Sequence, residues 1–162
     1  MITLVRVDNR LIHGQVVEAW LPHLKVDRVV VADDEAAHSP LIRAAMGLAV
    51  PSNVDVVIEP LDAVDFGNVA RDAVKTLVLV RDVDGALAAG LKGLALQHLN
   101  LGNVHFATGR RQVSASVFLS GTELSKLQSL AEHGSEIEAR GVPSDRPISM
   151  VEMGERFAKG SA

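Results

Sequence analysis

The sequence predicts a doubly wound α/β fold, in which helices cover both faces of a mostly parallel central sheet. Two observations support this prediction. Short runs rich in Val and Ile alternate along the chain with longer segments in which apolar residues recur at helical spacing. The runs are almost continuously apolar, as in parallel strands that are buried on both faces. Because strand–helix units of this kind join by right-handed crossovers, we expect a single domain over residues 1–162.

Four runs in the first half of the chain are nearly continuous in Val and Ile, and we predict a strand in each. They are residues 2–7, 28–32, 54–58 and 76–80. The first helix is predicted to begin near Gly14 and to end at Trp20, because Pro22 cannot continue the helical hydrogen bonding.

Three further helices are predicted before residue 92. Ser39 is a suitable N-cap and Pro40 a suitable first residue for a helix that runs to about residue 49. Another helix starts after Asp62. A fourth covers residues 83–91, although its two glycines lower the helix propensity.

In the second half of the chain, the first predicted element is a strand at residues 112–119, where apolar residues alternate with others. Ser120 and Glu123 then have the spacing of a capping box, which starts a helix that ends at Gly134. A last strand and a short C-terminal helix are predicted at residues 136–142 and 149–158.

The composition excludes several classes of protein. Cysteine is absent, which excludes disulfides, thiolate metal sites and cysteine nucleophiles. A net charge of −4 without any Lys/Arg run argues against nucleic-acid binding. No apolar stretch approaches the roughly 20 residues that a membrane-spanning helix needs. We therefore expect a cytoplasmic protein that uses neither a metal nor an organic cofactor.

Residues 6–16, at the end of the first predicted strand and just after it, contain the side chains best suited to catalysis and anion binding. His13 can act as a neutral nucleophile near pH 7. Arg10 can hold a phosphate by two parallel hydrogen bonds, and Asp8 can accept the N–H of one ring nitrogen. Gly14 begins a helix, whose free N–H groups attract an anion. Since open α/β sheets bind ligands at the carboxyl ends of their strands, we expect a phosphate to meet a histidine at this edge.

The residue types alone leave an alternative open. Turns between a strand and a helix often carry polar groups. His13 could equally be a half-buried loop histidine, with the neighbouring arginines as ordinary surface charges.

Four stretches of the sequence, taken in order, carry a resemblance to a known family. They are RVDNRLIHGQV, VVVADDEAA, LNLGNVH and VPSDRP, at residues 6–16, 29–37, 99–105 and 142–147. Together they resemble the IIB component of the mannose/sorbose (mannose-fructose-sorbose) family of the bacterial phosphoenolpyruvate-dependent sugar phosphotransferase system. In that family the second stretch forms a strand and turn, the third an Asn-x-Gly loop and the fourth a C-terminal segment. The resemblance covers nearly the whole chain and implies a single IIB domain over residues 1–162.

The resemblance also implies a phosphocarrier. Phosphate would pass from a phosphohistidine on a IIA domain, here on a separate chain, to IIB and then to a sugar bound by membrane components IIC and IID. The family histidine is His13, phosphorylated on Nδ1, and its catalytic partners are Arg10 and Asp8. We expect the phosphate to be bound by Arg6, Arg10, Gly14 and Gln15. The same site would also serve a regulatory phosphohistidine protein of an incomplete phosphotransferase system without sugar transport.

Other polar residues have less specific predictions. Residues 33–35 are acidic, and we interpret them as the first turn of a helix rather than as a metal site. His105 lies in the stretch that resembles the Asn-x-Gly loop, while Ser144 and Arg146 lie in the C-terminal stretch. All three are candidates to approach the His13 loop.

Overall fold

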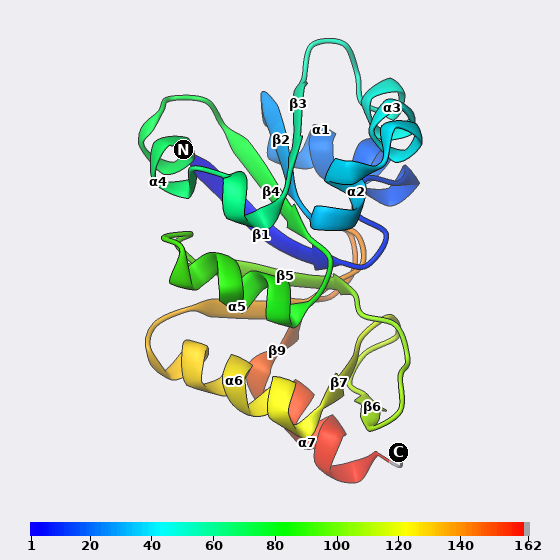
Figure 1. Ribbon diagram of the computed structural model, residues 1–162. Helices are drawn as coiled ribbons and strands as arrows, with labels where there is room; N and C mark the ends of the chain where they lie inside the picture. Colours follow the sequence, from blue (N-terminus) through cyan, green and yellow to red (C-terminus); the bar gives the residue numbers. More distant parts are fainter. Residues whose placement is uncertain (161–162) are drawn as a thin grey trace.

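A seven-stranded sheet forms the centre of the molecule (Figure 1). The structure is a computed structural model that describes residues 1–160. The strand order is β3-β2-β4-β1-β5-β8-β9, and all neighbouring strands are parallel except β8 and β9. The strands are β1 (Ile2–Asp8), β2 (Arg28–Ala32), β3 (Asp55–Glu59), β4 (Thr76–Val80), β5 (His98–Asn103), β8 (Glu136–Ala139) and β9 (Ile148–Ser149). The predicted mostly parallel sheet is confirmed.

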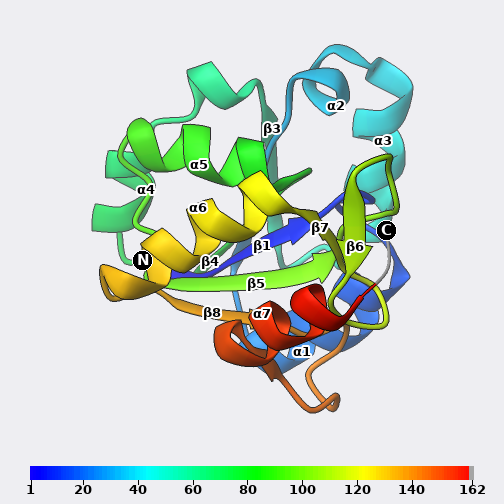
Figure 2. The ribbon, with the colours of Figure 1, turned by 90° about the horizontal axis from the view of Figure 1, so that it is seen from below.

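Helices cover both faces of this sheet, as the doubly wound fold requires (Figure 2). One face is covered by η1 (Val16–Trp20), α1 (Leu21–Leu24), α2 (Asp34–His38) and α3 (Pro40–Ala49). The other is covered by α4 (Phe66–Arg71), α5 (Val83–Leu91), α6 (Gly121–Glu132) and α7 (Met150–Lys159), and a short 3₁₀ turn, η2 (Leu61–Ala63), precedes α4. Strand β4 shows why the strand runs are continuously apolar, because Leu77 and Leu79 pack into one core while Val78 and Val80 pack into the other.

Local capping signals place several helices where the sequence predicts them. The Ser39 hydroxyl accepts a hydrogen bond from the backbone N–H of Ile42, and α3 begins at Pro40. Ser120 and Glu123 form the predicted capping box of α6. These interactions span three residues, so short-range spacing is enough to predict them.

The predicted end of the first helix at Trp20 is wrong. A π-helical turn, η1, leads directly into α1, and the chain leaves the helix only at Lys25, which has a φ of +53°. The backbone N–H of Leu21 bonds to the carbonyl of Val16, five residues back. Pro22 therefore lies in the first turn of α1, where a missing N–H is tolerated.

The predicted strand over residues 112–119 is also wrong. The chain instead forms an antiparallel pair of short strands, β6 (Arg110–Gln112) and β7 (Phe118–Ser120). The backbone N–H groups of Val113 and Ser114 both donate to the carbonyl of Val117, and these bonds reverse the chain between the two strands. Val113 and Val117 are buried, but in a tight turn rather than in one continuous strand.

The strand predicted over residues 136–142 ends early, at Ala139. The next two carbonyls, of Arg140 and Gly141, turn towards the guanidinium of Arg6 instead of continuing the sheet. The stretch expected from the resemblance to be an Asn-x-Gly loop is mostly strand, since Asn100 and Gly102 both lie within β5. Two of the corrected elements therefore meet at Arg6.

The chain changes sides of the sheet between two neighbouring strands. The connection that leaves β1 turns to the face covered by η1 and α1, whereas the connection that leaves β4 turns to the face covered by α5. In open α/β sheets such a switch opens a crevice at the carboxyl ends of the strands. The loop that contains His13 leaves β1 at this edge (Figure 1).

Candidate functional site

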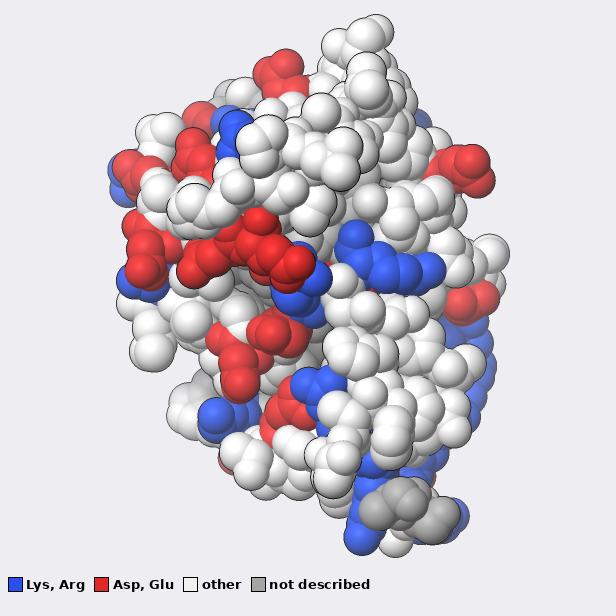
Figure 3. Space-filling view, turned by 45° about the vertical axis from the view of Figure 1, so that its right-hand side comes forward, with Lys and Arg blue, Asp and Glu red and all other residues white. Residues whose placement is uncertain are grey.

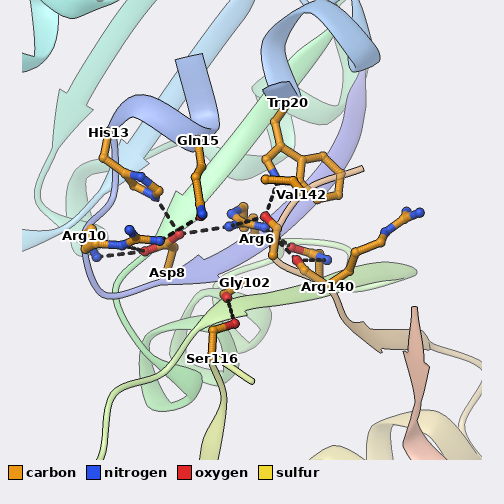
Figure 4. A network of polar contacts seen from close by, with 12 residues as sticks. Arg6, Asp8, Arg10, His13, Gln15, Trp20, Gly102, Ser116, Arg140 and Val142 are labelled. Atoms are coloured by element: carbon orange, nitrogen blue, oxygen red, sulfur yellow. Dashed lines mark hydrogen bonds and ion pairs between the residues drawn. The ribbon is translucent and has the colours of Figure 1, made fainter. Parts of the chain in front are cut away.

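The loop after β1 folds back so that His13 lies over the end of its own strand. Leu11 has a φ of +57°, a backbone conformation that side chains other than glycine rarely adopt. Its N–H donates to the carbonyl of Asp8 at 2.9 Å, and its side chain is buried. The tight turn brings Nε2 of His13 to 2.8 Å from Oδ2 of Asp8 (Figure 4). Strain of this kind is often retained at functional sites.

Asp8 is completely buried and accepts hydrogen bonds from three residues. Its Oδ2 receives Nη2 of Arg6 at 3.0 Å as well as His13, and its Oδ1 receives the backbone N–H of Arg10 at 2.9 Å. Figure 4 shows Arg6 and His13 both directed at the carboxylate of Asp8. Burial raises the pKa of Asp8, but these hydrogen bonds and the nearby positive charges outweigh it, so the pKa lies below its ordinary value. Asp8 is therefore an ionised acceptor at neutral pH.

The ionised state of Asp8 defines the hydrogen-bonding role of the histidine. A carboxylate can only accept, so Nε2 of His13 carries the hydrogen of this contact. In a neutral imidazole the second nitrogen, Nδ1, then keeps a lone pair. The His13 side chain is 15% exposed, which leaves the ring at the surface while its partner is buried. The arrangement can present one basic ring nitrogen to a ligand.

Arg10 and Gln15 lie beside His13 at the same edge (Figure 4). The Arg10 side chain is 41% exposed, and its Nη2 donates to Oε1 of Gln15 at 3.0 Å. Gly14 begins the helical segment, and no atom lies within 4 Å of the place where a Cβ would stand. The chain thus places an exposed cation, an amide and an open helix start beside the ring.

Arg6 differs from Arg10, because it is completely buried beneath Asp8. Its guanidinium donates to Asp8, to Oδ1 of Asn100 and to the carbonyls of Arg140 and Gly141. Burial lowers the pKa of Arg6, while the charge of Asp8 acts in the opposite direction. Protein acceptors therefore bind both terminal nitrogens of the Arg6 guanidinium. The sequence analysis did not foresee this network, although a polar Asn and a Gly inside a buried strand were a signal.

The other residues singled out in the sequence lie apart from this network. His105 is exposed, and its carbonyl accepts from Arg110, whose guanidinium also pairs with Glu123. Ser144 is exposed as well. Arg146 pairs with Glu152 of α7 at 3.0 and 3.1 Å. The part of the chain that does reach the His13 network lies just before the C-terminal stretch: the carbonyls of Arg140 and Gly141 accept hydrogen bonds from Arg6.

Acidic side chains gather beside basic ones on the face of the molecule seen in Figure 3. A hollow at the carboxyl ends of β2 and β4 is lined by Asp33, Asp34, Glu35, Asp82 and Arg81, among others. Asp33 caps α2 and Asp82 caps α5, and Asp33 also forms a bidentate pair with Arg81. The prediction that the acidic run starts a helix is confirmed. Within residues 1–160 we find no cluster of side chains arranged to hold a metal ion.

Comparisons with known proteins agree with this fold. Residues 2–160 match the family described as PTS system sorbose subfamily IIB component. The N-acetylgalactosamine-specific phosphotransferase enzyme IIB component 2 of Escherichia coli (strain K12) is 29% identical over 153 residues, which cover 94% of this chain and 98% of the relative. The PTS system mannose-specific EIIAB component of the same strain is 27% identical over 164 residues, which cover 98% of this chain and 50% of the relative. The crystal structure of manxB from Thermoanaerobacter tengcongensis superposes with a TM-score of 0.87 at 27% identity, covering 97% of this chain and 96% of that one.

These matches define the protein as a phosphotransferase of a sugar phosphotransferase system. The chain belongs to the family of IIB components of the sorbose subfamily of this system. No helix within the described residues is long and apolar enough to cross a membrane.

Proposed function

We propose that this protein accepts a phosphoryl group on Nδ1 of His13 from a phosphohistidine of a IIA partner and then passes it to a sugar. One observation carries the proposal: Nε2 of His13 is engaged by buried Asp8 at 2.8 Å, so the nucleophilic lone pair belongs to Nδ1. The resemblance of residues 6–16 to the family signature supports the same choice of histidine.

The transfer exchanges one P–N bond for another. Nδ1 attacks phosphorus in line, the P–N bond of the donor breaks, and the donor ring recovers its electron pair. The His13 ring gains positive charge as the bond forms, because Nε2 keeps its hydrogen. Asp8, already ionised and oriented, stabilises that charge through the same hydrogen bond. The contact is therefore stronger in the transition state than in the resting protein.

The phosphate needs cationic and N–H donors around its oxygens. We assign this role to Arg10, whose exposed guanidinium is tethered to Gln15, and to the backbone N–H groups at the open helix start of Gly14. Gln15 contributes from the same turn. In place of the phosphate contact predicted for Arg6, we propose a supporting role, because its guanidinium is buried among protein acceptors.

The partners follow from the family. We infer that the donor is a IIA domain on a separate chain; the EIIAB name of one relative, of which this chain matches half, supports a IIA–IIB partnership. We propose that the acceptor is a sugar held by membrane components IIC and IID, and that this chain is one IIB domain that works in the cytoplasm and meets the membrane transiently.

The test is phosphate transfer from phosphoenolpyruvate, through the general phosphotransferase proteins and a matching IIA, onto this chain. The product is mapped by mass spectrometry at neutral or alkaline pH, because acid hydrolyses phosphohistidine. We expect phosphate on His13 and none on the His13→Ala variant. The control is His105→Ala, which removes an exposed histidine that lies outside the His13 network, and we expect this variant to be labelled normally. Labelling of a different residue, or no labelling with a competent donor, would contradict the proposal. Formation of a sugar phosphate after membrane components are added separates transport from a regulatory role.

A further inference from the structure

Arg6 is a charged side chain held inside the protein by four acceptors, which bind its two terminal nitrogens, Nη1 and Nη2. Its side chain has no exposed surface. Asp8, Asn100 and the carbonyls of Arg140 and Gly141 accept its hydrogen bonds, at 3.0 to 3.1 Å for Asp8 and the two carbonyls. Transferring a guanidinium out of water is costly unless its hydrogen bonds are replaced in this way. The four acceptors come from three separate parts of the chain, so the position of Arg6 is defined by the fold rather than by its neighbours in sequence.

Strand β5 is shaped to receive this side chain. Asn100 and Gly102 are two residues apart, so both lie on the face of β5 that is turned towards Arg6. A Cβ at Gly102 would lie 2.0 Å from the guanidinium carbon of Arg6, a separation that non-bonded atoms do not adopt. The carbonyl of Gly102 accepts the Ser116 hydroxyl at 2.6 Å, which fixes the strand at this point (Figure 4). The absence of a side chain at residue 102 is therefore what makes room for Arg6.

Trp20 closes the network from the helical side. Its indole N–H donates to the carbonyl of Gly141 at 2.8 Å, and its ring lies 5.1 Å from the guanidinium carbon of Arg6. The guanidinium of Arg140 lies 5.4 Å from the same ring. The π-helical turn that contains Trp20 is part of the same segment that begins just after His13. Arg6 is thus connected to the histidine through Asp8 on one side and is packed under the following helix on the other.

We propose that Arg6, held by Asn100 and by the carbonyls of residues 140 and 141, is a positioning residue that fixes Asp8 and thereby keeps the hydrogen of the His13 ring on Nε2. Arg6 and His13 share one oxygen of Asp8, while the Arg10 backbone occupies the other. With both oxygens engaged, the carboxylate cannot rotate away from the ring. The effect of Arg6 on phosphate acceptance rests on the proposed function, whereas the effect of Arg6 on the tautomer of the His13 ring does not.

The test measures the ring tautomer directly, by nitrogen NMR of ¹⁵N-histidine-labelled protein. In the unmodified protein we expect the neutral His13 ring to be almost entirely in the form with hydrogen on Nε2. Arg6→Lys keeps the charge but cannot reach all four acceptors, because an ammonium lacks the planar fork of a guanidinium. We expect this variant to contain a mixture of the two tautomers and to accept phosphate at least tenfold more slowly. Asn100→Ala removes one acceptor only, and we expect a smaller change in the same direction.

Arg28→Lys is the matched control. Arg28 is also largely buried and forms a bidentate pair with Asp72, but at the amino end of β2, on the opposite edge of the sheet. We expect this variant to keep both the His13 tautomer and the rate. If Arg6→Lys does not fold, Asn100→Ala decides alone.

A folded Arg6→Lys or Asn100→Ala protein with the unchanged tautomer overturns the positioning role, even if His13 accepts phosphate normally. Conversely, a tautomer shift in a protein that never accepts phosphate leaves the positioning role intact and refutes the proposed function. The two failures are therefore distinguishable.

Discussion

Replacing Gly102 by Ala places a methyl group 2.0 Å from the guanidinium carbon of Arg6, which is too close for both groups to keep their positions. The guanidinium has to move away from its four acceptors, one of which is the buried carboxylate of Asp8. Breaking a buried, hydrogen-bonded charge pair costs about 3–5 kcal/mol. Since 1 kcal/mol shifts the midpoint by about 2–4 °C in a domain of this size, we expect Tm to fall by roughly 6–20 °C.

The assay is thermal unfolding followed by circular dichroism, with phosphate acceptance measured at a temperature where the variant is folded. Gly47→Ala is the control, because Gly47 lies in α3 with no atom within 4 Å of the added Cβ. That substitution removes the helix penalty of glycine and should raise the free energy of unfolding by about 0.5–1 kcal/mol. A Gly102→Ala protein whose Tm stays within about 2 °C of the parent would refute the packing of Arg6 against β5, since even 1 kcal/mol shifts Tm by about that much.

Three further predictions concern separate parts of the molecule. Arg10→Ala should slow phosphate acceptance by about tenfold to a thousandfold, as the loss of one hydrogen-bond donor to the transition state does in other enzymes. The rate is measured by rapid quench, and a variant that accepts phosphate as fast as the parent would show that Arg10 has no part in the mechanism. Hydrogen bonds from Arg28 lower the pKa of Asp72 from 3.8 to about 2, so the stability from this pair is complete above pH 3.8 and is lost as the pH falls towards 2. Asp72→Asn should therefore be less stable than the parent at pH 6, with a difference that shrinks between pH 4 and pH 2; a difference independent of pH would contradict the assignment. Ser120→Ala removes the α6 capping box and should lower the free energy of unfolding in urea by about 1 kcal/mol, whereas Ser125→Ala, on the exposed face of the same helix, should leave it nearly unchanged.

Much of the fold follows from local patterns. Runs such as 28–32 and 76–80 are strands with the predicted bounds, because burial on both faces requires an apolar residue at every position. Helix caps at Ser39 and Ser120 act over three residues and are visible in the spacing alone. These parts of the prediction are correct because the physical interactions that determine them are short-range.

Two of the parts that the sequence analysis missed depend on contacts between distant residues. Asn100 and Gly102 look unsuited to a buried strand until Arg6, 94 residues from Asn100, is placed against them. The early end of β8 has the same origin, because the carbonyls that follow it turn to Arg6 rather than to the sheet. The helix continues past Trp20 because a π-helical turn precedes Pro22, which no spacing rule anticipates.

The candidate site divides in the same way. The contact between His13 and Asp8 was expected from their spacing in one loop, and the structure brings the two side chains to 2.8 Å. The position of Arg10 and Gln15 at the surface beside them is equally local. What the spacing could not reveal is that the two arginines of the segment lie on opposite sides of Asp8, with Arg6 buried and Arg10 exposed. Their catalytic roles stay predictions.

The central claim is that the phosphoryl group is carried by Nδ1 of His13, and the most direct measurement is the ¹⁵N and ³¹P NMR spectrum of the phosphorylated, histidine-labelled protein. Our account predicts coupling between phosphorus and Nδ1, a hydrogen on Nε2, and loss of the signal in His13→Ala. Coupling to Nε2 would mean that phosphate displaces Asp8 from the ring, and it would contradict the arrangement from which the mechanism is derived.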